Sequence, residues 1–102
     1  MEFLQQGDVL LKPTNFTSDL VEIKTNVLQE GEHTGHAHRL HGDGFTVFEH
    51  PATKRKHLRV VKGGVMLRHE EHKAFEVPPG DYDVDIVREY DHFEEETRQV
   101  AD

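Results

Sequence analysis

The chain has 102 residues, no cysteine and a formal net charge of −8 at pH 7. Its length suits one domain, the missing thiols exclude disulfides and thiolate zinc sites, and the charge argues against non-specific nucleic-acid binding. No apolar stretch reaches the roughly 18–20 residues of a membrane span, and the N-terminus lacks a signal-peptide pattern. We therefore expect a cytoplasmic protein that binds neither nucleic acid nor membrane.

Alternation of apolar and polar residues, which is typical of strands, runs through most of the chain. In chain order it predicts strands at 8–12, 20–29, 34–41, 45–49, 57–61, 65–69, 73–77 and 81–90. The glycines of "KGG" (62–64) predict a hairpin between the fifth and sixth of these strands. In the last strand Tyr82, Val84 and Ile86 alternate with three aspartates, which predicts one buried and one acidic face.

This pattern predicts an all-β fold, a small antiparallel barrel or sandwich of the cupin-like or jelly-roll-like kind. We assign residues 1–90 to this single domain. The acidic segment 91–102 fits a short helix, because acidic residues occupy its first turn and Arg98 follows, or an extended arm. Only 34% of the residues are apolar, so the core is expected to be thin, and a homodimer could supply additional burial.

Two groups of histidines have a spacing that suits a shared site. His36 and His38 are two residues apart, so a strand would point both to one side. His69 and His72 lie where a strand ends and a turn begins. Four imidazoles from these groups could hold zinc, iron, nickel or copper, and we expect them to be metal ligands. The alternative is that some are ordinary strand residues, because a histidine-rich chain brings such pairs together by chance.

The other histidines give weaker signals. His33 and His41 flank the first pair near turns, and we expect His50, His57 and His92 to face solvent. The "HEEH" sequence (69–72) lacks the spacing of the helical HExxH metalloprotease motif, and no phosphate-binding glycine loop is present. No nucleotide cofactor is therefore expected.

A few further residues are candidates for chemistry. Glu71 and Tyr90 are the candidate catalytic residues, and Tyr82 could line a cavity. Glu70 and Glu71, between the two histidines, could act as a base or orient a ligand. The alternative for the two glutamates is exposure to solvent, and for Tyr90 it is a role in capping the last strand.

Part of the chain resembles the cupins, small β-barrels that hold a metal through histidines. Gly31 followed by "HAH" (36–38) resembles their first motif, and "VPPGDYDV" (77–84) resembles the Pro-x-Gly turn of their second motif. Residues 39–42 contain no glutamate where cupins have one, and no histidine follows the turn at the cupin distance. The resemblance implies a metal site inside a barrel, with room for a small-molecule ligand.

A second resemblance spans nearly the whole chain. The order "GHAHR", "HEEH", "PPGxY" and "REY" is similar to that of a family of small uncharacterised bacterial and phage proteins. It implies that these motifs belong to one site or one structural core, and it implies no biochemical function.

Two functions are therefore open. The first is a cupin-like protein that binds a divalent metal through its clustered histidines, a site that could also serve a metal-dependent enzyme. The second is a non-enzymatic protein-interaction or structural β-module without metal, whose acidic face could meet a basic partner. In either case closely placed imidazoles should release metal, or lose stability, below about pH 6.

Overall fold

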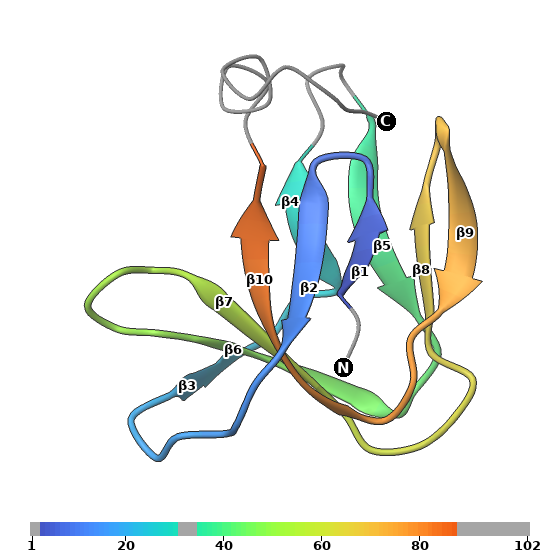
Figure 1. The fold of residues 1–102 in the computed structure, drawn as a ribbon. Helices are drawn as coiled ribbons and strands as arrows, with labels where there is room; N and C mark the ends of the chain where they lie inside the picture. Colours follow the sequence, from blue (N-terminus) through green and yellow to red (C-terminus); the bar gives the residue numbers. More distant parts are fainter. Residues whose placement is uncertain (1–2, 31–34, 88–102) are drawn as a thin grey trace.

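The computed structural model describes residues 3–30 and 35–87, and its regular structure is entirely β-strand (Figure 1). His33, Tyr90, His92 and the segment 91–102 lie outside the described residues. The strands are β1 (Leu4–Gln6), β2 (Val9–Pro13), β3 (Val21–Ile23), β4 (Val27–Glu30), β5 (Ala37–His41), β6 (Phe45–Glu49), β7 (Lys56–Val60), β8 (Met66–His69), β9 (His72–Glu76) and β10 (Gly80–Ile86).

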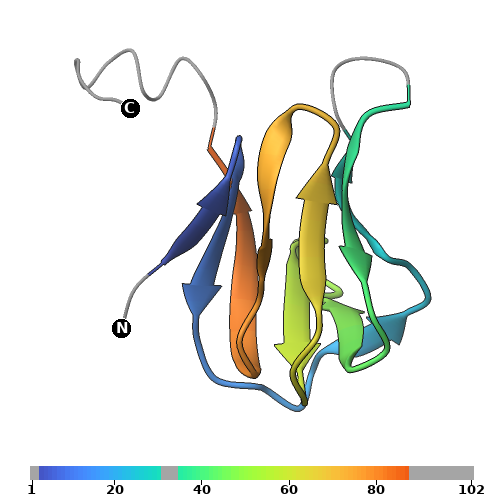
Figure 2. The same ribbon diagram turned by 90° about the vertical axis from the view of Figure 1, so that its right-hand side faces the viewer.

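These strands form two antiparallel sheets. One has the order β1-β2-β10-β7-β6-β3 and the other has the order β4-β5-β8-β9. Figure 2 shows the smaller sheet lying across the larger one. Both sheets contribute to one apolar core, which includes Leu11 and Leu58 from the first and Leu28, Leu40 and Leu67 from the second. The prediction of an all-β antiparallel fold is confirmed. The prediction allowed a barrel or a sandwich, and the structure is a sandwich rather than a closed barrel.

The predicted strand 20–29 is in fact two strands that belong to different sheets. β3 pairs with β6, whereas β4 pairs with β5. Residues 24–26 make the step between them, and hydrogen bonds hold it: the Asn26 carbonyl accepts from the Leu40 N–H, and Thr25 Oγ1 accepts from the Val27 N–H. The alternation continues through this step, so the sequence pattern alone gives no sign of it.

The predicted hairpin at "KGG" is wrong, because β7 and β8 lie in different sheets. Residues 61–65 instead carry the chain from one sheet to the other, beside the crossing 42–44, and the Val61 N–H donates to the Gly44 carbonyl. Consecutive strands pair as hairpins at β4–β5, β6–β7 and β8–β9, the last with His69 paired to His72 across a two-residue turn. Strand β1, which the alternation does not predict, forms a further hairpin with β2 around Gly7.

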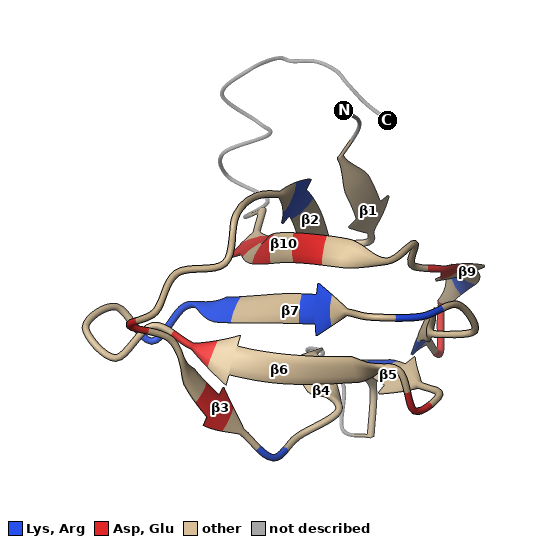
Figure 3. Ribbon diagram, turned by 90° about the horizontal axis from the view of Figure 1, so that it is seen from below, with Lys and Arg blue, Asp and Glu red and all other residues tan. Residues whose placement is uncertain are grey.

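The two faces of β10 differ as predicted, but the acidic face is not simply solvated. Tyr82 and Val84 are buried in the core. On the opposite face, Asp81 receives hydrogen bonds from His57 and Arg59 of β7, and Asp85 pairs with Lys12 of β2. Figure 3 shows the acidic residues of β10 beside basic residues of β7. His57, expected in solvent, is only 1% exposed, because Phe16 and Phe48 pack edge-on against its ring.

Candidate functional site

Three segments far apart in the sequence meet at one end of the sandwich, the upper end in Figure 1. They are the β1–β2 turn, the residues that enter β5, and the β8–β9 turn. Strand pairing brings the last two together, since β5 pairs with β8. The Gln6 side chain attaches the β1–β2 turn to β8 and β9, because its amide donates to the carbonyls of Leu67 (2.9 Å) and Lys73 (3.0 Å).

All four histidines predicted as ligands lie at this end. The ring of His69 is central: its centroid is 4.3 Å from that of His38, 4.7 Å from that of His72 and 5.8 Å from that of His36. We call these four residues the histidine cluster. Strand periodicity explains half of it, because His36 and His38 point to the same side as Leu40, whose side chain is in the core. His41 is exposed on β5, outside the cluster.

Within the histidine cluster, His36 and His69 have a geometry that suits a metal ion, together with Glu70. Each of the three residues offers one ligand atom, and these atoms all lie within 4.8 Å of one another. His36 and His69 are partly buried, whereas Glu70 is exposed. A metal ion could therefore reach the three ligands from solvent.

Glu70 also fixes the position of the β5 entry. Its Oε1 accepts the Ala37 N–H at 3.0 Å, and its Oε2 accepts from Arg39 at 3.2 Å. The bond from Ala37 is the main reason that the pKa of Glu70 lies below its ordinary value. Glu70 is thus a carboxylate, the form that a metal ion binds, and it joins the β8–β9 turn to His36 through the backbone.

The contacts of His38 determine which of its ring nitrogens carries the proton. Both Gln6 N–H groups are used by carbonyls, so Gln6 Oε1 faces His38 Nδ1 at 2.9 Å and must accept its proton. In the neutral ring, His38 Nε2 then presents a lone pair. That atom is 3.1 Å from Asp8 Oδ1, so two acceptors face each other, and only a shared cation, a proton or a metal ion, makes the contact favourable.

A proton is poorly favoured at His38. Burial of the ring lowers the pKa of His38, and the neighbouring His69 lowers it further, although the Asp8 carboxylate acts in the opposite direction. His38 is 1% exposed. Its donated Nδ1 proton matches the usual environment of metal-bound histidines, whose second nitrogen donates to a nearby oxygen.

His72 and Glu71 complete the surroundings. A Cβ atom on Gly7 would lie 2.5 Å from His72 Nε2, so the absence of a side chain at position 7 is what admits the His72 ring. Glu71, a candidate catalytic residue, is 58% exposed, and its carboxylate is 3.6 Å from His36 Nδ1. Tyr82 does not lie in the histidine cluster; its hydroxyl donates to the Pro78 carbonyl within the fold, and burial raises its pKa.

Sequence reasoning did not single out Gln6 and Asp8, and it did not name Glu70 as a ligand. The stretch "QQGD" (5–8) does carry a signal, because two polar side chains flank a glycine immediately before an apolar strand. Such a turn places both side chains at one end of a hairpin. Their partner could not be read from the sequence, because it depends on how the two sheets meet.

The structure and the comparisons leave the cupin resemblance unconfirmed. Comparison with curated proteins and with solved structures gives no match. Within residues 3–30 and 35–87, no helical segment has the length and apolar character needed to cross a membrane. Residues 5–87 match the family described as a domain of unknown function, DUF8820. This range covers most of the chain and all of the histidine cluster, and the chain therefore belongs to the DUF8820 family.

Proposed function

We propose that this domain binds a divalent transition-metal ion, such as zinc, at the histidine cluster. The observation that carries the proposal is the convergence of ligand atoms from His36, His69 and Glu70 within 4.8 Å. Two imidazoles and one carboxylate are a ligand set that zinc commonly accepts. Zinc bonds of about 2.0–2.2 Å place tetrahedral ligands roughly 3.4 Å apart, a closure that rotation of the side chains can supply.

One hydrogen bond opposes this arrangement, and the free energy lost by breaking it is small. The Glu71 N–H donates to His69 Nδ1 at 3.0 Å, so the neutral ring carries its proton on Nε2. A metal ion at Nε2 would require the proton to move to Nδ1 and this hydrogen bond to break. The loss is about 0.5–1.5 kcal/mol, whereas structural zinc sites contribute roughly 10 kcal/mol or more. Metal binding therefore outweighs the contact.

His38 and Asp8 support the proposal from the neighbouring position. Their facing acceptors, Nε2 and Oδ1, are 3.1 Å apart, close to the separation of adjacent ligands on one metal ion. With His38 beside His69, the cluster offers more donor atoms than one ion needs. Metal binding, rather than catalysis, is the function that these contacts support.

Zinc binding to the untagged protein tests the proposal. We expect one equivalent of Zn²⁺ by calorimetry and, at a hundredfold excess over Kd, a stabilisation of about 2.7 kcal/mol. For a domain of this size that stabilisation raises Tm by roughly 10–20 °C. The double variant H36Q/H69Q should lose both effects. The matched control H41Q/H50Q, which removes two histidines outside the cluster, should keep them.

The alternative is a structural or interaction module without metal, and one observation favours it. Gln6 and Glu70 already join the three segments through hydrogen bonds within the protein. If that is their whole role, Zn²⁺ will leave Tm unchanged in the parent protein, or H36Q/H69Q will bind Zn²⁺ as tightly as the parent. Either result would overturn metal binding at this cluster.

A further inference from the structure

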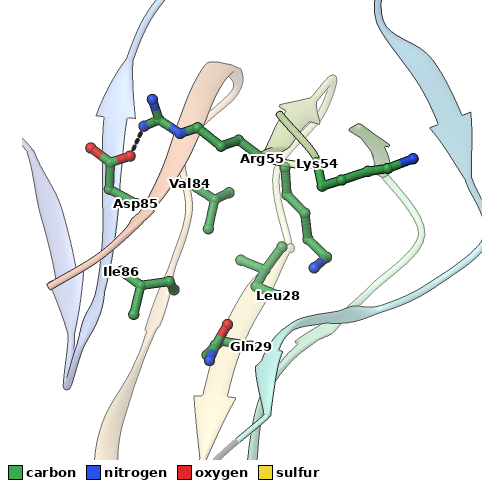
Figure 4. Close-up of a pocket in the computed structure, with 8 residues that line it drawn as sticks. Leu28, Gln29, Lys54, Arg55, Val84, Asp85 and Ile86 are labelled. Carbon is green, nitrogen blue, oxygen red and sulfur yellow. Dashed lines mark ion pairs between the residues drawn. The ribbon is translucent and has the colours of Figure 1, made fainter. Parts of the chain in front are cut away.

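A second candidate site lies away from the histidine ligands, in a pocket of about 320 Å³ between the two sheets. Its lining comes from Leu28 and Gln29 of β4, from residues 54–56 at the start of β7, and from residues 84–86 of β10. Figure 4 shows these side chains around the pocket. The volume is at the lower end of the range typical of small-molecule sites.

The walls of this pocket are of two kinds. Ile86 supplies apolar surface together with the edges of the largely buried Leu28 and Val84, whereas residues 54–56 are three consecutive cations, Lys-Arg-Lys. Figure 4 shows Leu28, Val84 and Ile86 close together, with Arg55 extending past Val84 to its partner Asp85 and with Lys54 directed away from the apolar group. A ligand that fills the pocket would therefore meet an apolar surface at one end and positive charge at the other.

Two of the three cations have no acidic partner among the described residues. Arg55 pairs with Asp85, which also binds Lys12 at 2.6 Å. None of the ion pairs within residues 3–30 and 35–87 involves Lys54 or Lys56. The lining thus holds three cations against one carboxylate, in a chain whose net charge is −8. This local excess of positive charge would attract an anion.

The backbone at Lys54 has an uncommon conformation. Its φ of 66° makes it the one non-glycine residue with positive φ among the described residues. The turn holds it there, because the Lys54 N–H donates to the His50 carbonyl and the His50 N–H donates to the Arg55 carbonyl. Lysine is disfavoured in this conformation, so the hydrogen bonds of the turn are what hold residue 54 beside the pocket.

We propose that this pocket binds a small amphipathic monocarboxylate. Its alkyl body would lie against Leu28, Val84 and Ile86, and its carboxylate would pair with Lys56 and with Lys54, whose exposed side chain is free to rotate toward it. The apolar wall favours such a ligand over inorganic anions. Lys54 and Lys56, which form no ion pair within the part of the chain that the structure describes, favour it over neutral molecules. The proposal does not depend on the histidine cluster, which lies on other residues.

An NMR titration with acetate, hexanoate and octanoate tests the proposal. Binding is monitored through the amide chemical shifts of the protein, with a chelator present. Affinity should rise roughly fourfold for each methylene that enters the pocket. Hexan-1-ol, which has the same chain without the charge, should bind at least tenfold more weakly than hexanoate. The shift changes should centre on residues 28–29, 54–56 and 84–86.

Lysine variants distinguish binding in this pocket from non-specific attraction of anions to the protein surface. K54Q/K56Q should weaken hexanoate binding at least tenfold, whereas K24Q/K62Q, which removes the same charge from exposed lysines elsewhere, should leave it within twofold. Equal weakening by both pairs would overturn the proposal. So would affinity independent of chain length, shift changes centred elsewhere, or no hexanoate binding at millimolar concentration. The chelator keeps each outcome independent of metal binding.

Discussion

At the scale of single residues, Gln6 determines the chemistry of His38. With both amide N–H groups donated to backbone carbonyls, Gln6 can only accept from His38 Nδ1. The imidazole is therefore oriented and restricted to one neutral tautomer before any ligand arrives. Strand periodicity placed His38 on the correct side of β5, but the tautomer depends on a residue thirty-two positions away.

This arrangement predicts that the metal-free protein loses stability at mildly acidic pH. Burial and His69 lower the pKa of His38 in the folded state, so the unfolded chain takes up the proton more readily. The stabilisation from His38 is present above the unfolded pKa of about 6.5 and is lost as pH falls below that value toward the folded pKa. Urea unfolding with a chelator at pH 7.5 and 5.5 should show the decrease.

His38→Gln supplies the comparison, because glutamine keeps a donor and an acceptor but does not titrate in this range. The variant should show a smaller decrease in the free energy of unfolding between the two pH values than the parent. The control His41→Gln, at an exposed position of the same strand, should show the parent's decrease. If the His38→Gln variant shows the same decrease in the free energy of unfolding as the parent, a group other than His38 causes the pH dependence.

At the scale of elements, the sequence predicted strands well and their pairing poorly. The eight predicted segments overlap all of β2 to β10, because each strand has one face in the core and the alternation of the sequence follows that face. Alternation does not record which sheet a strand joins, so 20–29 was read as one strand and 57–69 as a hairpin. The acidic face of β10 is a similar case, since its partners come from β2 and β7.

The contacts on that face predict a measurable effect of Asp81→Asn. The Asp81 carboxylate accepts from His57 at 2.7 Å and from Arg59 at 3.0 and 3.3 Å. Hydrogen bonds to charged groups contribute about 1.5–3 kcal/mol, so we expect a loss of about 2 kcal/mol in the free energy of unfolding at pH 7. Asp43→Asn, at an exposed ion pair with Lys62, should change it by less than about 0.5 kcal/mol.

The effect of Asp81 should also depend on pH. Burial raises its pKa, but the hydrogen bonds from His57 and Arg59 outweigh burial and leave the pKa below the ordinary 3.8. Its stabilisation is therefore present above pH 3.8 and is lost as pH falls below that value. The difference between Asp81→Asn and the parent should shrink in this acid range. A difference that stays constant down to pH 2 would contradict the assignment.

At the scale of the whole molecule, the candidate site exists because the two sheets are held in a fixed relation. Spacing within "GHAHR" and "HEEH" predicted which histidines share a site. Asp8 and Gln6 join them only because β1, which the pattern did not reveal, lies beside β9 at the same end. Two of the crossings that connect the sheets, 42–44 and 61–65, run side by side and help to fix one sheet relative to the other.

The close approach of these crossings predicts that Gly42→Ala is strongly destabilising. Gly42 has a φ of 119°, and a Cβ there would lie 2.7 Å from the Gly64 carbonyl oxygen. The strained backbone and the clash together should lower the free energy of unfolding by at least about 2 kcal/mol. Gly63→Ala is the matched control, because its φ is not positive and the nearest atom to its Cβ would be 3.4 Å away. Urea unfolding should separate the two variants by more than about 1.5 kcal/mol, and equal stabilities would show that the crossings can shift apart without cost.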